Sequence, residues 1–479
     1  MDEEHEKKTG EIQRSTHDDD GSQDSKLDHI PVDLTLEVLS KHDATSLVRY
    51  NCVSKIWSYL TTLPSFINSF GSRVDKEQEE KTGEIKMATH DDDDERSQHF
   101  QLDYLPFDLT LEILSRLPAK SLVRYRCVSK NWSSLTTLPS FIDLFGSRSS
   151  ARQPRLLLSF VLEERKRFVF SFPQHHNPDG SCPPLYSYQI TDPCLNEKYK
   201  REHECFNRTS TISESVHGLI LLNGNKIWNP SLRRFFTLPD PKDYVPGNVY
   251  MWYLGYDPLE DKHKVLSVLR DKHFEPPQVL TLGAQESWRI TESYPMHYPS
   301  GGDGRCINGV VYYAASVVIG NKTFSKYLTS FDVKSEKFNP PVKFPKTCSW
   351  SGTMSSYDGK LALVNSTTPF GDVDLYILKD ETGDEWTHKR YHVDCHSEWT
   401  SRMHFWGITD NDELIFAPTG WWYELFYILY FDPRRHITRP AWFDGGTMVK
   451  ELRRSYILSK RRINSIGVFP NHIESLLSL

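Results

Sequence analysis

The sequence predicts an α+β multidomain protein in which two small three-helix units precede an all-β, propeller-like domain. The first third of the 479-residue chain contains the same segment twice, with apolar residues at helical spacing. After residue 149, short strand-like runs recur between Pro, Gly, Asn and Asp, and no stretch keeps a long helical period. The two parts of the chain are therefore expected to fold as different classes.

The repeated segment indicates a tandem duplication. Residues 28–73 and 103–148 align without a gap, and 33 of 46 positions are identical. The preceding stretches match as well, because KKTGEI and THDDD before the first copy correspond to EKTGEI and THDDDD before the second. The copied unit therefore includes its tail.

Three short helices are expected in the second copy. The first stripe consists of Leu109, Ile113, Leu114 and Leu117. Pro106 suits the first turn of this helix, and Pro118 ends it and starts a second helix that carries Leu122 and Val123. The third stripe consists of Cys127, Val128, Trp132 and Leu135. So small a unit cannot bury all these side chains, and the surplus apolar face indicates a docking surface.

The second copy, LPFDLTLEILSRLPAKSLVRYRCVSKNWSSL, resembles an F-box, the module that binds the Skp adaptor of cullin–RING ubiquitin ligases. The landmarks LP, EIL, LP, SL, R, CVSK and W occur in order. The resemblance implies that the apolar residues pack in the module or contact the adaptor. The implied adaptor-binding residues are Leu105, Pro106, Leu109, Ile113, Leu114, Leu117, Pro118, Leu122, Val123, Val128 and Trp132. The alternative is that they form only the core of a helical domain.

The first copy departs from this pattern. His42-Asp43 replaces the second Leu-Pro pair, and Asn51 stands where the other copy has Arg126. A buried, unpaired aspartate at an interface costs several kcal/mol, on the order of 2–7. We therefore hypothesise that the second copy docks the adaptor and that the first is degenerate.

Composition divides the chain further. Two stretches rich in charged residues, Ser and Gln, residues 1–26 and 74–100, are expected to be a disordered tail and linker. The remaining segments are the first copy at 27–73, the second copy at 101–148, a β domain at 150–445 and a C-terminal segment at 446–479. The His-Asp runs lack the glycine turn of a calcium loop, so no metal is expected there.

The β domain is expected to be a propeller. Its runs include RLLLSFV at 155–161 and VDLYILK at 373–379, where Val373, Leu375 and Ile377 fall on one side of a strand and Asp374, Tyr376 and Leu378 on the other. Many short strands indicate a sandwich, barrel or propeller. At about 40–50 residues per blade, the length allows six or seven blades. Radial closure also protects sheet edges, which favours a propeller over two tandem sandwiches.

The segment HGLILLNGNKIWNPSLRRFFTLPD, residues 217–240, is similar to the start of the plant F-box-associated domain. YLGYDPLEDKHKVL, VLTLGAQESWR, INGVVYY, FDVKSEKF and SYDGKLALV continue the pattern in order, and the likeness covers roughly residues 150–440. The chain thus resembles a plant F-box protein with tandem F-box motifs and a C-terminal, kelch-like F-box-associated domain. The resemblance implies a β domain that selects substrates.

Several residues of this domain have expected roles. Asn229-Pro230 and Asp257-Pro258 should cap the backbone of the residues that follow them. The glycines expected at positive φ or at close backbone approaches are Gly218, Gly255 and Gly359. Trp228 and Trp288 are interpreted as blade-packing residues. Adjacent Trp421 and Trp422 would face opposite sides of a strand, so one is a candidate partner contact.

No catalytic, cofactor-binding or metal-binding set is recognisable. The sequence lacks a phosphate loop, H-E-x-x-H, G-x-S-x-G and a Rossmann fingerprint, and none of its eight cysteines forms C-x-x-C. His175-His176 is expected in a surface loop, and the basic run at 450–462 on a solvated face, the alternative being a nuclear signal or anion patch. The chain is therefore predicted not to be an enzyme.

Bulk properties and the resemblance together give the expected function. A net charge of −7 argues against nucleic acid as a partner, and no apolar run approaches a membrane span. The N-terminus does not resemble a secretory signal, so a cytoplasmic or nuclear location is expected. The resemblance implies a substrate-recognition adaptor of a Skp–cullin–F-box ubiquitin ligase, with a Skp-type adaptor, through it cullin, and an unknown protein substrate as partners. The alternatives are a ligase-independent scaffold and a kelch-type propeller that binds a ligand in its channel.

Overall fold

The computed structural model describes residues 107–478, except 129, 163–165, 176–180, 183, 194–212, 223–224, 271–274, 284–286, 293, 301–303, 320–322, 348–352, 367–370, 380–384, 395–402, 419–426 and 444–462. The predicted tail, the first copy and the linker lie outside the described residues, as do Leu105 and Pro106. The expectations for these segments stay predictions.

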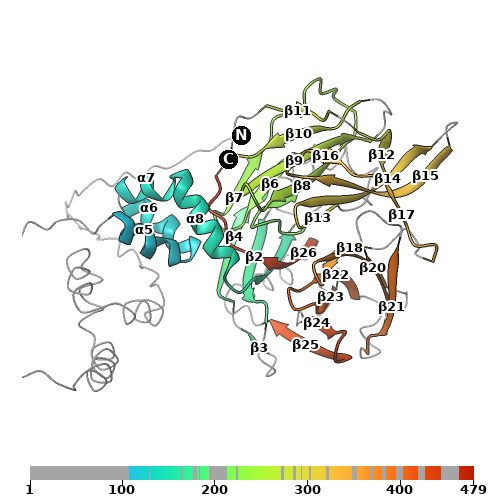
Figure 1. Ribbon diagram of the computed structural model, residues 1–479. Helices are drawn as coiled ribbons and strands as arrows, with labels where there is room; N and C mark the ends of the chain where they lie inside the picture. Colours follow the sequence, from blue (N-terminus) through green and yellow to red (C-terminus); the bar gives the residue numbers. More distant parts are fainter. Residues whose placement is uncertain are drawn as a thin grey trace, which may run out of the picture. The chain divides into compact units, whose positions relative to one another are not determined.

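Four helices open the described part of the chain (Figure 1). They are α5 (Phe107–Arg116), α6 (Ala119–Val128), α7 (Lys130–Thr136) and α8 (Pro139–Ser150). Pro118 precedes α6 and Pro139 opens α8, as expected for a residue that needs no hydrogen bond in the first helical turn. The prediction of a three-helix unit is therefore not supported for this copy.

The differences lie at the third expected stripe. Cys127 and Val128 end α6, so the stripe is divided between α6 and α7. The following run, PSFIDLFGSRSS, forms the additional helix α8, and its residues Phe141, Phe145 and Ser149 are buried at intervals of four. This spacing places them on one face of the helix, which is the signal that predicts a buried helix.

The rest of the described chain forms six small β-sheets that are the blades of a propeller (Figure 1). Blade 1 contains β26 (Ile463–His472), β1 (Arg155–Leu162), β2 (Lys166–Pro173) and β4 (Tyr186–Thr191). Blade 2 contains β5 (Ile220–Leu222), β6 (Lys226–Asn229) and β7 (Arg234–Thr237). Blade 3 contains β8 (Tyr250–Asp257), β9 (Lys262–Leu269), β10 (Gln278–Thr281) and β11 (Arg289–Ile290).

The remaining three blades follow in chain order. Blade 4 contains β12 (His297–Pro299), β13 (Arg305–Ile307), β14 (Val310–Ile319), β15 (Thr323–Asp332), β16 (Lys337–Phe338) and β17 (Val342–Lys343). Blade 5 contains β18 (Thr353–Tyr357), β19 (Lys360–Ser366), β20 (Asp372–Leu378) and β21 (Trp386–His392). Blade 6 contains β22 (Met403–Ile408), β23 (Leu414–Pro418), β24 (Tyr427–Asp432), β25 (Ile437–Phe443) and the parallel strand β3 (Ser181–Cys182).

Blade 1 is built from both ends of the propeller sequence. Strand β26 pairs with β1 in antiparallel register, with Leu158 opposite Val468 and Phe160 opposite Ile466. Residues 446–479 were expected to lie apart from the β domain, whereas residues 463–472 form the first strand of this blade. Because β26 also lies beside β22 of blade 6, this pairing closes the ring.

Both faces of a blade are buried, because each blade packs between two others. The expected alternation in β20 is confirmed: Val373, Leu375 and Ile377 share an apolar cluster with blade 6. Tyr376 and Leu378 point to the other side and join a cluster with blade 4. Alternate side chains of β20 therefore enter two different apolar cores, one on each face of the blade, rather than a core and solvent.

A buried ion pair within blade 1 also contacts blade 2. The Arg167 guanidinium lies 2.5 Å from Asp192, and the two side chains are 5% and 1% exposed. The same guanidinium lies over the Trp228 ring, 4.9 Å from its centroid, so a charge of blade 1 packs on the core of blade 2. Such a pair contributes more to a unique arrangement of the blades than to net stability.

We predict that Arg167→Ala lowers the free energy of unfolding by about 3–5 kcal/mol, because Asp192 stays buried and loses its guanidinium partner. Chemical denaturation of the full chain measures the change. The control is Lys379→Ala, which removes an exposed pair with Glu385 and should cost no more than about 1 kcal/mol. Equal effects of the two substitutions would contradict the assignment.

Candidate functional site: a helical module seated on the propeller

The predicted adaptor-binding residues fall into three groups. Leu105 and Pro106 lie outside the described residues, and for Leu109, Val128 and Trp132 only the place in a helix is described. Ile113, Leu114 and Leu122 are buried. Leu117, Pro118 and Val123 are partly buried. The last group retains exposed apolar surface.

Four residues of the predicted set contribute to the core that joins the helices to the propeller, because the partly buried Leu117 and Val123 pack against it. Leu114 and Leu122 pack in one apolar cluster with Phe141 and Phe145 of α8. Leu232 of blade 2 and Leu476 near the C-terminus belong to the same cluster. Leu114 and Leu122 therefore pack in a core that the helices share with the propeller.

Arg148 of α8 and Arg152, which follows α8, donate hydrogen bonds to groups at the C-terminal end of α5. The Arg152 guanidinium donates to the carbonyl oxygens of Ser115 at 3.0 Å and Leu117 at 3.5 Å. Arg148 donates to the Glu112 carbonyl at 3.1 Å and to Ser115 Oγ at 2.6 Å. Cations are favourable at a helix C-terminus, where carbonyl groups lack partners. Hydrogen bonds from Arg148 and then Arg116 lower the pKa of the Glu112 carboxyl.

A buried carboxylate joins α6 to the propeller. Glu474, 3% exposed, accepts a hydrogen bond from the Ala119 N–H at 3.2 Å, at the first residue of α6. Its other oxygen lies 2.7 Å from Arg155 at the start of β1, and Arg152 lies 3.7 Å away. A carboxylate is favourable at a helix N-terminus. One side chain therefore contacts the helices, the linker and blade 1.

We call residues 473–477 the C-terminal strap. Asn229 Nδ2 donates to the Ser475 and Leu477 carbonyls at 3.2 and 3.0 Å. Leu477 packs against the apolar cluster of blades 2 and 3. Gly218, at φ +85°, lies so close that a Cβ atom there would be 2.8 Å from the Ile473 carbonyl oxygen. The expectation of positive φ and close approach at Gly218 is confirmed.

The two Asx-Pro turns are confirmed and help to build this junction. Asn229 Oδ1 accepts from the N–H groups of Ser231 and Leu232 at 3.0 and 3.1 Å, which places Leu232 in the helical cluster. Asp257 Oδ1 accepts from Leu259 N–H at 2.9 Å in the turn that lies under α8. The same asparagine that shapes its turn also holds the strap.

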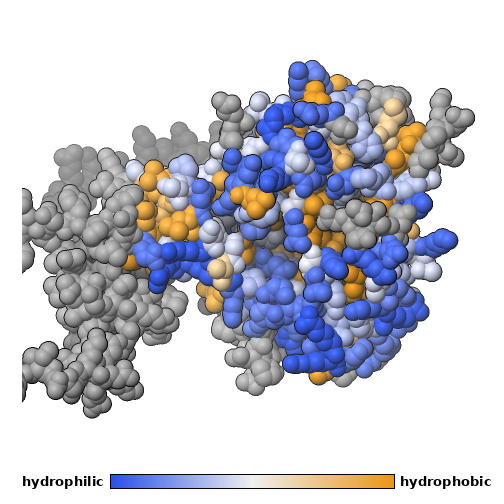
Figure 2. Space-filling view, in the orientation of Figure 1, coloured by the Kyte–Doolittle hydropathy of each residue, from blue (hydrophilic) through white to orange (hydrophobic). Residues whose placement is uncertain are grey.

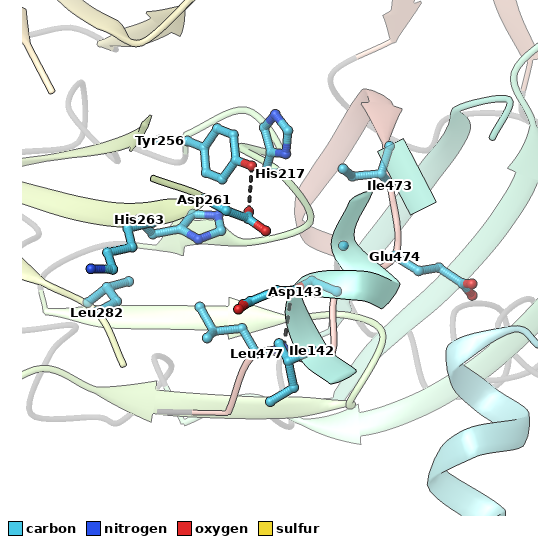
Figure 3. A pocket seen from close by; sticks show the side chains of 13 residues that line it. Ile142, Asp143, His217, Tyr256, Asp261, His263, Leu282, Ile473, Glu474 and Leu477 are labelled. Carbon is cyan, nitrogen blue, oxygen red and sulfur yellow. Dashed lines mark hydrogen bonds between the residues drawn. The ribbon is translucent and has the colours of Figure 1, made fainter. Parts of the chain in front are cut away.

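A cavity of about 50 Å³ lies between α8, blade 3 and the strap (Figure 3). The Tyr256 hydroxyl donates to Asp261 at 2.5 Å, and the His217 ring stacks on Tyr256 with centroids 3.4 Å apart. Burial lowers the pKa of His217 and of His263 to about 4, so both rings are neutral at pH 7. Burial, and then Asp261, raise the pKa of Asp143.

The cavity has room for a few water molecules and is far smaller than the usual ligand pocket of about 300–1,000 Å³. Within the described ranges, no group of three or more His, Cys, Asp or Glu side chains could hold a metal ion. Cys306 is a free thiol, and burial raises its pKa to about 12, which disfavours the reactive thiolate. These features fit a structural joint better than a catalytic site.

A polar contact joins the segment before blade 2 to blades 4 and 5. Glu214, before blade 2, lies 3.7 Å from the Arg305 guanidinium on β13 of blade 4 and accepts a hydrogen bond from the Cys306 N–H at 3.2 Å. Arg305 is 7% exposed and also donates to the Met354 carbonyl of blade 5 at 2.8 Å. These polar groups therefore bind one another and connect three parts of the propeller.

Other predicted residues have mixed outcomes. Trp228 is fully buried, and Trp288 packs edge-on against Trp252, so the blade-packing interpretation is confirmed for both. His175 lies 2.9 Å from the Asp410 carboxylate of blade 6, and this hydrogen bond raises the pKa of His175. His176, Trp421, Trp422 and the basic run 450–462 lie outside the described residues.

The surface of the helices differs from that of the propeller. Figure 2 shows apolar surface gathered on the helical module, whereas hydrophilic side chains cover much of the visible propeller rim. Leu138, between α7 and α8, is 39% exposed. In the part of the chain that the structure describes, no helix has the length and apolar character to cross a membrane.

Comparison with protein families agrees with this architecture. Residues 102–144 match the F-box domain, and residues 155–473 match the F-box associated beta propeller domain. The chain belongs to the F-box proteins with an associated β-propeller. The F-box match covers the second copy, so the tandem F-box arrangement and a kelch relationship stay expectations.

Relatives cover nearly the whole architecture. F-box protein At5g18160 of Arabidopsis thaliana is 37% identical over 415 residues, which are 85% of this chain and 100% of the relative. F-box protein At1g48060 of the same plant is 32% identical over 390 residues, 78% of this chain and 93% of the relative. Among solved structures, a Hadza microbial sialidase, Hz136, aligns at TM-score 0.29 and 9% identity, covering 62% of this chain and 59% of its own. A likeness that weak carries no argument.

We predict that Arg126→Asn, which copies the residue of the first repeat, destabilises the F-box helices by about 1–3 kcal/mol. Arg126 donates to Thr136 Oγ1 at 3.0 Å and to the Thr136 carbonyl at 2.8 Å, and asparagine is too short to reach both. Hydrogen exchange of the α6 and α7 amides measures the effect. Arg116→Asn, which removes an exposed pair with Glu112, is the control and should cost at most about 0.5 kcal/mol.

We predict that stability falls as pH decreases from 6.5 toward 4. Burial lowers the pKa of His217 and His263 to about 4 and of His472 to about 3, so below pH 6.5 the unfolded chain takes up protons that the folded chain does not. Each histidine contributes a slope of about 1.4 kcal/mol per pH unit in this window. The free energy of unfolding, measured by denaturation at pH 7.5, 6 and 5, should depend less steeply on pH for His472→Asn than for the wild type. Exposed His392→Gln is the control, and equal slopes for both variants would refute the assignment.

Proposed function

We propose that this chain is the substrate-recognition subunit of a Skp–cullin–F-box ubiquitin ligase. The F-box at 102–144 would bind a Skp-type adaptor, and through it cullin, while the propeller would bind a target protein. The observation that carries the proposal is the presence of both domains in one chain, joined by the buried cluster around Leu122 and Leu476. Such a subunit does no bond chemistry and accelerates ubiquitin transfer by proximity.

Within the F-box, the proposed adaptor surface is the part that the propeller leaves uncovered. Leu117, Pro118 and Val123 retain exposure, while Leu114 and Leu122 shape the surface from below. Leu105, Pro106, Leu109, Ile113, Val128 and Trp132 complete the proposed set. An apolar surface of this kind on a small helical unit is typical of a protein interface.

The first copy is proposed not to dock the adaptor. His42-Asp43 stands at the position of Leu117-Pro118, so the corresponding surface would carry a charge at its centre. Desolvating that charge opposes binding. The tandem arrangement would then leave one working docking unit in each chain.

The proposed target-binding face of the propeller is the one opposite the F-box. The turn at 257–261 and the strap lie on the F-box side, next to α8. Strand β8 ends at this turn and so runs toward the F-box side, which places the connection before β8 at the other end of the blade. Tyr244 and Val245, 38% and 43% exposed, belong to this connection and offer apolar contact surface.

We predict that the double substitution Leu117→His/Pro118→Asp, which copies the first repeat, lowers adaptor affinity at least about a hundredfold. Capture of a Skp-type adaptor by the purified full chain measures this effect. Leu34→Asp/Pro31→Ala in the first repeat should leave capture unchanged, as should Ile437→Asp, an exposed site in blade 6. Loss of capture only with the first-repeat variant would reverse the assignment of the two copies.

A further inference from the structure

The C-terminal strap is not needed to complete any blade. Strand β26 ends at His472, and the next residues pair with no strand. Yet Glu474, Ser475 and Leu476 are as buried as the propeller core. The strap therefore buries charged and apolar side chains for contacts outside the sheets.

These contacts all converge on the joint between the F-box and the propeller. Leu476 packs with Leu114, Leu122, Phe141 and Phe145 of the F-box helices. Ser475 N–H donates to Ser231 Oγ of blade 2 at 3.1 Å. On one side the strap thus contacts helices, and on the other it is bonded to the turn after β6.

One buried carboxylate at the joint lies between two arginines. Glu474 lies between Arg155 at 2.7 Å and Arg152 at 3.7 Å, and its second oxygen receives the first N–H of α6. Arg152 in turn holds the last carbonyls of α5. Burial lowers the pKa of Arg152, an effect that the nearby Glu474 opposes. A buried, directional pair of this kind specifies orientation more than it adds stability.

We propose that Glu474 is a positioning residue and that the C-terminal strap fixes the orientation of the F-box on the propeller. The strap thereby sets where a bound target lies relative to the ubiquitin-transfer enzyme. This second step depends on the proposed function, whereas the orientation itself does not. Substitutions in the strap should therefore change the geometry of ubiquitin transfer but not the binding of the adaptor.

The orientation is tested by distance measurement in the full chain. Spin labels at exposed Ser140 in α8 and Lys360 in blade 5 report the geometry, and unnatural amino acids carry them because the chain has eight cysteines. The wild type should give one narrow distance distribution, and Glu474→Ala at least a twofold broader one. Glu474→Gln retains an acceptor for the Ala119 N–H but loses the charge, so its distribution should be intermediate.

The matched control is Glu413→Gln. Glu413 is also a shielded carboxylate, 13% exposed and 2.9 Å from Arg439, but it lies within blade 6. It should leave the distance distribution unchanged. A narrow, wild-type distribution for Glu474→Gln would overturn the proposal, and this conservative variant decides the outcome even if Glu474→Ala fails to fold.

A ubiquitin-transfer experiment distinguishes the proposed ligase function from the proposed role of the strap. In a reconstituted ligase, Glu474→Ala should keep adaptor capture within twofold of wild type but change which lysines of this chain receive ubiquitin and slow transfer at least fivefold. An unchanged lysine pattern would refute the effect on transfer. If the wild type itself captures no adaptor, the proposed function fails, and the distance measurement still tests the strap.

Discussion

The pairing of β26 with β1 is the contact on which the rest of the structure depends. It joins residues that are separated by about the whole propeller, from Arg155 to His472, and so closes the ring within a single blade. The pairing has a second consequence at the junction with the helices. Because β26 ends beside the first residue of β1, the chain that leaves it reaches Arg155, Arg152 and the start of α6. The pairing that closes the propeller therefore also positions the residues that contact the F-box helices.

Buried charges give the joint and the blades their specificity. Arg167 connects blade 1 to the Trp228 core of blade 2, and Lys264 of blade 3 donates to the Val333 carbonyl of blade 4 at 2.8 Å. Apolar contacts between blades are tolerant of small rotations, whereas a cation that must meet a particular carboxylate or carbonyl is not. The Glu474 contacts are of the same kind: a buried charge meets particular partners, here at the interface between the F-box and the propeller.

Local features were predictable from the sequence, and long-range ones were not. The alternation in β20 and the Asx turns at Asn229 and Asp257 depend on neighbours in the chain, and all three are confirmed. The run INSIGVFPNH contains Gly467 and Pro470, which argue against a strand. It forms β26 nevertheless, because Pro470 falls at a shift in register on a strand that has a sheet partner only on one side.

The candidate site also depends on long-range contacts that the sequence does not predict. The apolar stripes of the helices were readable, but which of their residues face the propeller depends on Leu232 and Leu476, more than 100 and 340 residues away in the chain. Likewise, His175 of blade 1 contacts Asp410 of blade 6, which lies 235 positions later in the chain. No spacing rule within a segment encodes such a neighbour, since it follows from ring closure.

The strap also bears on why the two copies of the duplicated unit are not equivalent. The chain has one Glu474, and its partners Arg152 and Arg155 follow the second copy by four and seven residues. At the same distances after the first copy, the sequence has Glu77 and Glu80. Acidic residues there could not pair with Glu474, and like charges oppose close approach. The residues that follow the two copies therefore differ in the charge that the Glu474 contact requires, independently of the difference at Leu117-Pro118.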